Sequence, residues 1–140
     1  MFDTSTELGA KVVRRFGQEG IIWLVTVRGD GTPQPSPVWF HWDGEAILIY
    51  SQPNTQKLRN IARNAKVSLN LNCDAWGYDV VIISGKARID EDAPLVREVP
   101  SFVKKYVEDL ESAKSMADFD RIMDGYTVAI RVTPTALRGW

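Results

Sequence analysis

The hydrophobic positions of the chain change their period several times, and each change predicts a new element. Between residues 8 and 16, apolar residues recur every three or four positions, which predicts a short amphipathic helix. Residues 21–27 are nearly all apolar and rich in β-branched and aromatic side chains, which favours a strand buried on both sides. Glycine and aspartate over 29–31 predict the hairpin turn that follows it.

The next strand is interrupted by prolines. Three prolines alternate with other residues over 33–37, and because proline has no backbone N–H, this half of the strand can pair fully along one edge at most. Residues 38–42 continue the strand. A second hairpin turn at 43–44 then leads into an apolar strand over 46–51.

A polar segment separates that strand from a helix. Asn54 is a favourable N-cap residue, and apolar residues at helical spacing predict a helix from there to about Asn64. Residues 66–72 alternate polar and apolar side chains, which is the pattern of a half-buried strand.

The second half of the chain contains one long strand and a helical insertion. Residues 79–89 predict a strand in which Gly85 marks a bend or bulge. Apolar spacing over 96–110 is helical, and Pro100 predicts a kink or two short helices there. The chain is then expected to form a short helix over 116–123, a strand over 126–132 and a tail closing on Trp140.

These elements predict a mainly β fold with α insertions. About six antiparallel strands, one helix between two of them and a helical insertion before the last one indicate a small barrel with helices plugging its ends. The chain has 140 residues, of which 44% are hydrophobic, so we expect a single domain over residues 1–140.

Composition limits the functions that such a domain can have. Seventeen basic and eighteen acidic residues give a net charge of -1, so no global basic field favours nucleic acid or an anionic membrane. The single cysteine, Cys73, excludes an internal disulfide and a multi-thiolate metal site, and no metal ligands are expected. No signal peptide or bilayer-spanning run is evident, which favours a soluble cytoplasmic protein.

The candidate chemistry lies where the strand over 46–51 meets the following helix. A helix start presents unpaired N–H groups and a partial positive charge, so this junction is a natural place for a phosphate. Lys57 falls in the first turn, where a cation is disfavoured unless an anion is present. The alternative interpretation is that Lys57 and Asn60 are solvated residues on a helix surface.

The order of several short motifs resembles a known family. Asp30-Gly31-x-Pro33, residues 36–40, residues 49–51, residues 57–61 and residues 67–69 together resemble the split β-barrel flavin-binding proteins of the pyridoxamine 5′-phosphate oxidase class. Within that class the chain is most similar to the actinobacterial branch that uses the deazaflavin coenzyme F420. The paired Arg and Lys motif for the phosphate of flavin mononucleotide (FMN) is not found.

The resemblance implies a split barrel with a domain-swapped-like homodimer interface and the cofactor between two protomers. It implies that the protein is an oxidoreductase transferring hydride from reduced F420 to an unsaturated or electron-poor small organic substrate. Two alternatives stay open: an FMN-binding oxidoreductase, or a non-catalytic cofactor- or tetrapyrrole-binding module. The residues that match cofactor-binding positions of the family are Pro37, Val38, Trp39, Ser51, Lys57 and Asn60.

Aromatic and titratable residues complete the set of candidates. Trp76 and Tyr78 fall on a turn and are too apolar for a loop facing water, so we expect them to cover the cofactor or a partner protomer. Tyr126 is a candidate proton donor to the substrate, although a structural tyrosine is commoner. His41, the only histidine, is interpreted as an ordinary strand residue.

Overall fold

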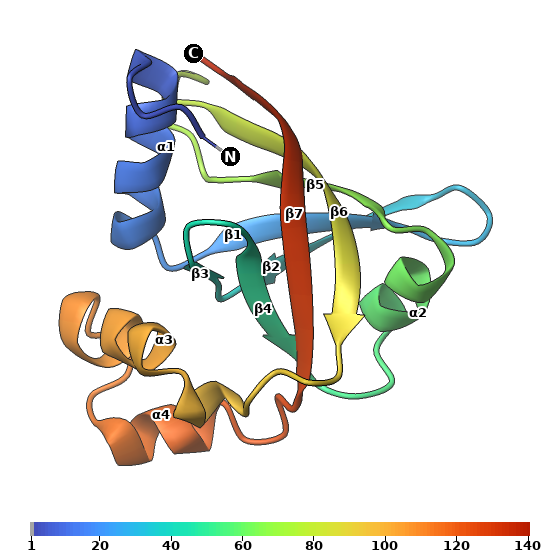
Figure 1. Cartoon of the computed structure of the whole chain (residues 1–140), viewed down its shortest axis with the longest axis vertical. Coiled ribbons are helices and arrows are strands. Elements are labelled where there is room, and N and C mark those ends of the chain that lie inside the picture. The colour runs from blue at the N-terminus through green and yellow to red at the C-terminus, as the bar shows by residue number, and fades with distance from the viewer. Residues whose placement is uncertain (1) are drawn as a thin grey trace.

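The computed structural model describes residues 2–140 and shows one curled antiparallel sheet with helices around it (Figure 1). The described residues form seven strands: β1 (Ile22–Val27), β2 (Pro33–Val38), β3 (His41–Trp42), β4 (Ile47–Ser51), β5 (Lys66–Asn70), β6 (Val81–Asp90) and β7 (Val128–Gly139). The helices are α1 (Glu7–Gln18), α2 (Gln56–Arg63), α3 (Pro100–Lys104) and α4 (Met116–Ile122), with a 3-10 turn η1 (Val96–Glu98) and a π-helix η2 (Lys105–Asp109).

The strands lie in the order β2-β1-β5-β6-β7-β4-β3, and all pairs are antiparallel. The two edge strands, β2 and β3, follow each other in the chain and are separated only by Trp39 and Phe40. The sheet therefore curls until its edges approach, without a β2–β3 ladder to close it. The mainly β split-barrel prediction with short helices is confirmed.

The predicted continuous strand over 38–42 is wrong, which raises the number of strands from about six to seven. The reason is that the backbone of Phe40 bonds to side chains instead of a strand. Its N–H donates to Tyr106 Oη at 2.8 Å, and its carbonyl accepts from Lys105 Nζ at 2.9 Å. Both partners come from η2, so a distant helix fills the opening of the barrel.

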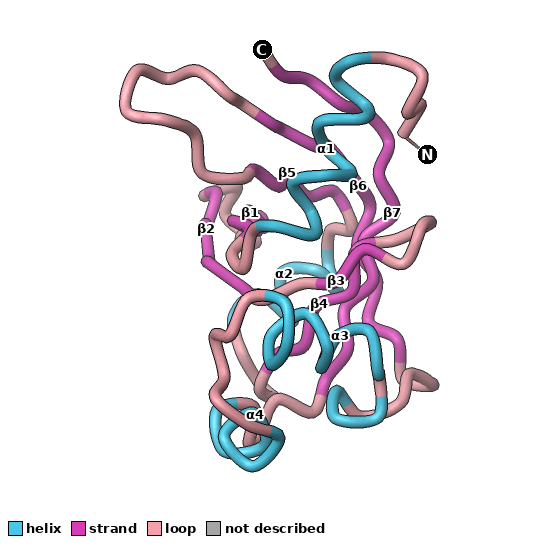
Figure 2. The backbone as a smooth tube through the Cα atoms, turned by 90° about the vertical axis from the view of Figure 1, so that its left-hand side faces the viewer, coloured by secondary structure: helices cyan, strands magenta, loops and turns pink. Residues whose placement is uncertain are grey.

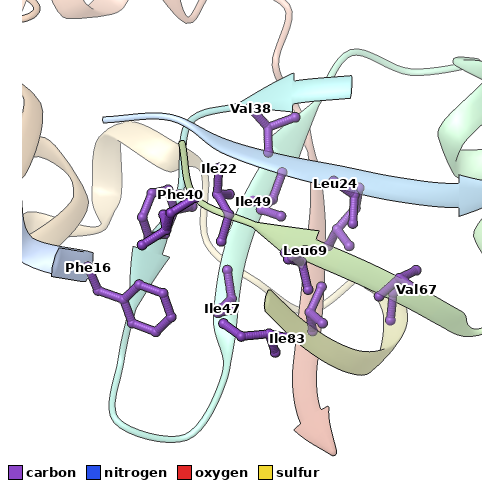
Figure 3. Close-up of a cluster of buried hydrophobic side chains, with 14 of the residues drawn as sticks. Phe16, Ile22, Leu24, Val38, Phe40, Ile47, Ile49, Val67, Leu69 and Ile83 are labelled. Atoms are coloured by element: carbon purple, nitrogen blue, oxygen red, sulfur yellow. The ribbon is translucent and has the colours of Figure 1, made fainter. Parts of the chain in front are cut away.

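The main core lies inside the curled sheet and contains buried side chains from six strands. Figure 3 shows part of it, including Ile22, Ile49, Leu69 and Ile83. Phe16 of α1 joins this core at one end. Strand β1 alternates buried and half-buried residues, so the prediction that it is buried on both sides is wrong. The half-buried residues are Trp23, Val25 and Val27, which alternate with the core residues and lie on the face turned away from the main core.

A second core cluster covers the outside of β4. Leu48 and Tyr50 point away from the barrel and pack against Phe102 of α3, Tyr106 of η2 and Phe119 of α4. All five residues of β4 are therefore buried. The insertion between β6 and β7 thus covers a side of the barrel, at the end of the molecule away from both chain termini (Figure 1).

Local turn chemistry is partly as predicted. The bulge expected at Gly85 lies between Ser84 and Gly85. Pro100, which interrupts the helical spacing of apolar residues, is the first residue of α3. The predicted N-cap Asn54 is wrong: Thr55 is the N-cap residue of α2, and Asn54 takes a positive φ of 62° in the turn before it. The predicted C-terminal tail is also wrong, because residues 133–139 continue β7 along β6.

Candidate functional site

A pocket of about 370 Å³ lies between the open edge of β2 and α4, and we call it the β2–α4 pocket. Its size is within the usual range for small-molecule sites, roughly 300–1,000 Å³. It brings together five residues that the sequence singled out: Pro37, Val38, Trp39, Lys57 and Tyr126. The remaining lining residues, which sequence reasoning missed, are Ile21, Ser36, Tyr50, Ile122 and Met123.

Trp39 supplies a flat wall to this pocket. Its ring stacks on Tyr106, with centroids 4.1 Å apart and planes within 3° of each other. Tyr106 is itself fixed, because its hydroxyl donates to Gly20 O at 2.8 Å and accepts from the Phe40 N–H. The indole is therefore held in one orientation, as a wall against a planar ligand requires.

The edge of β2 in the pocket is open. Strand β2 pairs with β1 along its whole length, and it is a terminal strand of the sheet of described residues. Its prolines give that edge few N–H donors, which also protects it against pairing with another sheet. Pro37 therefore presents a backbone acceptor at this edge, and Pro37 and Val38 both add apolar surface beside Trp39.

Lys57 is the only cation that lines the β2–α4 pocket among the described residues. It is half-buried, and burial lowers the pKa of its ammonium because no charged group offsets the loss of water around it. It lies in the first turn of α2, where the helix dipole opposes a positive charge. An anion in the pocket would relieve both costs, so this corner is suited to a phosphate or carboxylate.

The start of α2 is organised by two hydroxyl groups. Ser51 is fully buried, and its hydroxyl donates to Gln52 O at 2.8 Å and lies 3.0 Å from Thr55 Oγ1. The N-cap side chain of Thr55 accepts no hydrogen bond from the first turn of α2. Ser51 therefore shapes the turn rather than lining the pocket, and the helix amides keep their hydrogen-bonding capacity.

Asn60 is placed inside the protein and away from the pocket lining. Its side chain is fully buried and donates to Thr26 Oγ1 at 2.9 Å and to Gln34 Oε1 at 3.0 Å. The side-chain amide oxygen of Asn60, Oδ1, accepts a hydrogen bond from Gln56 Nε2 at 2.8 Å. These bonds tie α2 to β1 and β2, and so set the distance between Lys57 and the strand edge.

Replacing Asn60 with alanine should reduce the free energy of unfolding by about 2 kcal/mol, because it leaves the buried Thr26 hydroxyl with one partner fewer. Urea unfolding of the variant and the parent measures this difference. Arg59→Ala, at the exposed neighbouring position, is the control and should change stability by no more than about 0.5 kcal/mol. Equal effects of the two substitutions would contradict the role of Asn60 in joining α2 to β1 and β2.

The two tyrosines that line the pocket differ in the hydrogen bonding of their hydroxyl groups. The Tyr50 hydroxyl donates to Pro94 O, and burial raises the pKa of this phenol. Tyr126 is half-buried at the pocket wall and follows Gly125, which has a φ of 82°. Tyr50 thus joins β4 to the segment before η1, whereas the hydroxyl of Tyr126 has no such hydrogen bond among the described residues.

Trp76 and Tyr78 lie on the loop between β5 and β6, apart from the pocket. The exposed fractions of their side chains are 85% and 64%. The loop extends from the sheet in Figure 2, and the indole of Trp140 donates to Gly77 O at 3.0 Å. Three large aromatic side chains therefore gather at this end of the molecule with little cover from their own chain.

Two other features, a metal site and a membrane-spanning helix, have no candidate in residues 2–140. No three or more His, Cys, Asp or Glu side chains in residues 2–140 are grouped so that they could hold a metal ion. In the same range, no helix has the length and apolar character needed to cross a bilayer. His41 lines a different pocket, with the burial of its ring lowering its pKa.

Comparisons with solved structures agree with this architecture. A conserved hypothetical protein of Mycobacterium tuberculosis has a TM-score of 0.73 and 24% identity, covering 96% of this chain and 84% of that one. HutZ, a heme storage protein of Vibrio cholerae, has a TM-score of 0.65 and 18% identity, over 91% and 92% of the two chains. Both likenesses show the fold.

A third solved structure is closer in sequence. An F420 reductase is 32% identical, has a TM-score of 0.60 and covers 84% of this chain and 88% of its own. No match was found among curated proteins. The family model described as pyridoxamine 5′-phosphate oxidase matches residues 8–140. The chain therefore belongs to the pyridoxamine 5′-phosphate oxidase family.

Proposed function

We propose that this protein is an F420-dependent oxidoreductase that transfers hydride from the reduced deazaflavin to an unsaturated or electron-poor small organic substrate. The observation that carries the proposal is the placement of Lys57 in one pocket with Pro37, Val38 and Trp39. Lys57 is a half-buried cation with no counter-ion among the described residues. The 32% identity to an F420 reductase favours the deazaflavin over FMN.

The residues of the pocket fit a planar ring with an anionic tail. Lys57 and the uncapped first turn of α2 would hold the phosphate, since both favour negative charge there. The open edge of β2 and the fixed indole of Trp39 would bound the ring. The bound cofactor supplies the hydride, and the protein supplies orientation, charge and exclusion of water.

Reduction of a polarised double bond by hydride also requires a proton at the other atom. Tyr126 is the pocket phenol without a protein acceptor among the described contacts, and we propose it as the proton donor. The proton would leave Tyr126 Oη for the substrate carbanion or heteroatom and be replaced from water. Tyr50 is unsuited to this role, because its hydroxyl is used by Pro94 O.

We further propose that the protein works as a homodimer. An exposed apolar surface lies at one end of the sheet, where Trp76, Tyr78 and Trp140 come together. The exposed fractions of these three residues are 85%, 64% and 57%, and a surface of this kind is typical of a protein–protein interface. A second protomer placed over this end would bury these rings.

Titration with F420 and FMN side by side tests the proposed cofactor. We expect the anisotropy of F420 fluorescence to rise, or its intensity to be quenched, at micromolar protein, with weaker binding of FMN. Reduced F420 should then be oxidised in the presence of at least one member of a panel of nitro compounds and enones.

The alternatives give different results in the same assay. A yellow protein whose flavin is released by heat, with no response to F420, would identify an FMN-binding oxidoreductase. Tight F420 binding without turnover across the panel would indicate a binding module. No response to F420 at micromolar protein would overturn the proposal.

A further inference from the structure

A second pocket, of about 420 Å³, lies between α1, β3 and α3, and we call it the α1–α3 pocket. It shares no lining residue with the β2–α4 pocket. Val13 and Phe16 of α1 and Trp42 of β3 give it apolar walls. Its polar groups come mainly from the opposite side, where Lys104 and Lys105 follow each other at the junction of α3 and η2.

Lys105 is the unusual member of this lining, because it is a cation with 5% of its surface exposed. Its ammonium donates to Phe40 O at 2.9 Å and lies 3.5 Å from the centroid of the Phe40 ring. An ammonium has three N–H donors, and the described residues supply one hydrogen-bond acceptor. Both of its close contacts are uncharged, and no carboxylate of residues 2–140 forms a salt bridge with it.

The energetics of this arrangement favour an anion beside Lys105 whenever its amine is protonated. Burial lowers the pKa of Lys105 to about 7, and the carboxylate of Glu19 opposes the shift only in part because it pairs with Arg15. The contacts with the Phe40 carbonyl and with the face of the Phe40 ring favour the protonated form of Lys105. An anion within hydrogen-bond reach would favour the same form. The site is therefore poised so that a bound anion and a proton on Lys105 stabilise each other.

The backbone at Lys105 also departs from regular helix. Residues 105–109 form a π-helix, with the Leu110 N–H donating to Lys105 O at 2.9 Å. Short π segments are costly and occur frequently at functional sites. Here the wide turn sends Lys105 towards the α1–α3 pocket while the next residue, Tyr106, stacks on Trp39.

We propose that the α1–α3 pocket is a second ligand site, which takes a small monocarboxylate with an apolar body, with the Lys105 ammonium as counter-ion of the carboxylate. The apolar walls formed by Val13, Phe16 and Trp42 would receive the body of the ligand. Lys104 contributes little attraction, because it is exposed and pairs with Asp109 at 2.7 Å. The ligand therefore needs one negative charge and not two.

Benzoate is a suitable probe, and the only histidine is a built-in reporter. His41 lines the same pocket, so its ring protons should shift saturably when benzoate is added to the full-length protein at pH 6.5. Isothermal titration calorimetry on the same samples gives the affinity. The absence of a saturable shift at millimolar benzoate would overturn the proposal.

The pH dependence identifies the group that binds the anion. Since Lys105 must be protonated, the affinity should fall by up to about tenfold for each pH unit above 7. Other titratable or charged groups lie around Lys105, and they must not account for the same pH dependence. They are Glu19 at the end of α1, His41 on β3, Lys104 on α3, and Tyr106 and Asp109 on η2. The pKa of His41 is lowered and the pKa values of Lys104 and Tyr106 are raised, so these three groups do not lose a proton between pH 7 and 8.5. An affinity independent of pH over this range would contradict the role of Lys105.

Two matched variants separate specific binding at Lys105 from a general attraction of anions to this face. Lys105→Met should weaken benzoate binding about tenfold or more and still fold, because replacing a buried charge by an apolar side chain is often neutral or stabilising. Lys104→Met removes the same charge from the neighbouring position and should change the affinity less than about twofold. Equal losses in both variants would show non-specific attraction and overturn the proposal. Unchanged benzoate binding in Lys57→Ala would place the site outside the β2–α4 pocket, whatever the outcome for F420.

Discussion

Replacing Lys57 with alanine should weaken F420 binding about tenfold to a hundredfold, the loss typical of one charge-assisted hydrogen bond. The reason is that Lys57 is the cation of the β2–α4 pocket, and no acidic side chain in the described part of the chain pairs with it and competes with the ligand. The free energy of unfolding should stay within about 0.5 kcal/mol of the parent, since a half-buried unpaired lysine contributes little to the fold. Fluorescence anisotropy and urea unfolding measure the two quantities.

A control for this variant lies on the same helix. Arg59 is exposed two residues further along α2 and does not line the pocket, so Arg59→Ala should change the affinity less than about twofold. Lys57→Arg keeps the charge and should retain most of the affinity and its salt dependence. Equal affinities of Lys57→Ala and the parent would exclude the corner beside α2 as the anion site.

The parts of the fold that could be predicted are those with local causes. The helix over 8–16 and the strand over 66–72 have a hydrophobic period that their own neighbours determine, and both are present as α1 and β5. Gly85 and Pro100 also act locally, one through a bulge and the other through a missing N–H. These positions were predictable because the physical cause lies within a few residues.

The parts that could not be predicted depend on distant residues. Phe40 leaves the sheet because side chains 65 and 66 positions later bond to its backbone, and no local pattern encodes that contact. Residues 133–139 remain a strand because β6 is long enough to pair with them, despite Pro134 within the run. Tertiary pairing overrides local propensity in both cases.

The candidate site shows the same division. Pro37, Val38, Trp39 and Lys57 meet in one pocket, as their order around the strand and the helix start suggested. Ser51 and Asn60 came from the same motifs, yet the structure turns both inwards, because a short polar side chain close to the backbone readily bonds within the protein. Lys105 had no sequence signal, since it lies inside an apolar stripe typical of a core helix.

Arg15 links the ordered core to the exposed aromatic loop. Its side chain is 6% exposed and pairs with Glu19, while it donates to the carbonyls of Asn72 and Asp79 at the two ends of the loop that carries Trp76. Asp79 itself has a φ of 59°, a backbone conformation that needs support from its surroundings. The guanidinium therefore fixes where the proposed dimer surface lies.

Arg15→Met should lower the free energy of unfolding by about 3 kcal/mol, because it leaves two loop carbonyls and Glu19 without their shared donor. Arg15→Lys should recover only part of this loss, since one ammonium cannot reach three acceptors as a planar guanidinium does. Arg14→Met, at the adjacent exposed position, is the matched control and should change stability by no more than about 0.5 kcal/mol. Urea unfolding measures the stability, and amide hydrogen exchange should show faster exchange over residues 72–80 in Arg15→Met alone. Since the loop carries Trp76 and Tyr78, the same variant should also weaken the proposed homodimer in sedimentation experiments. Unchanged stability and exchange would mean that the loop is held without Arg15.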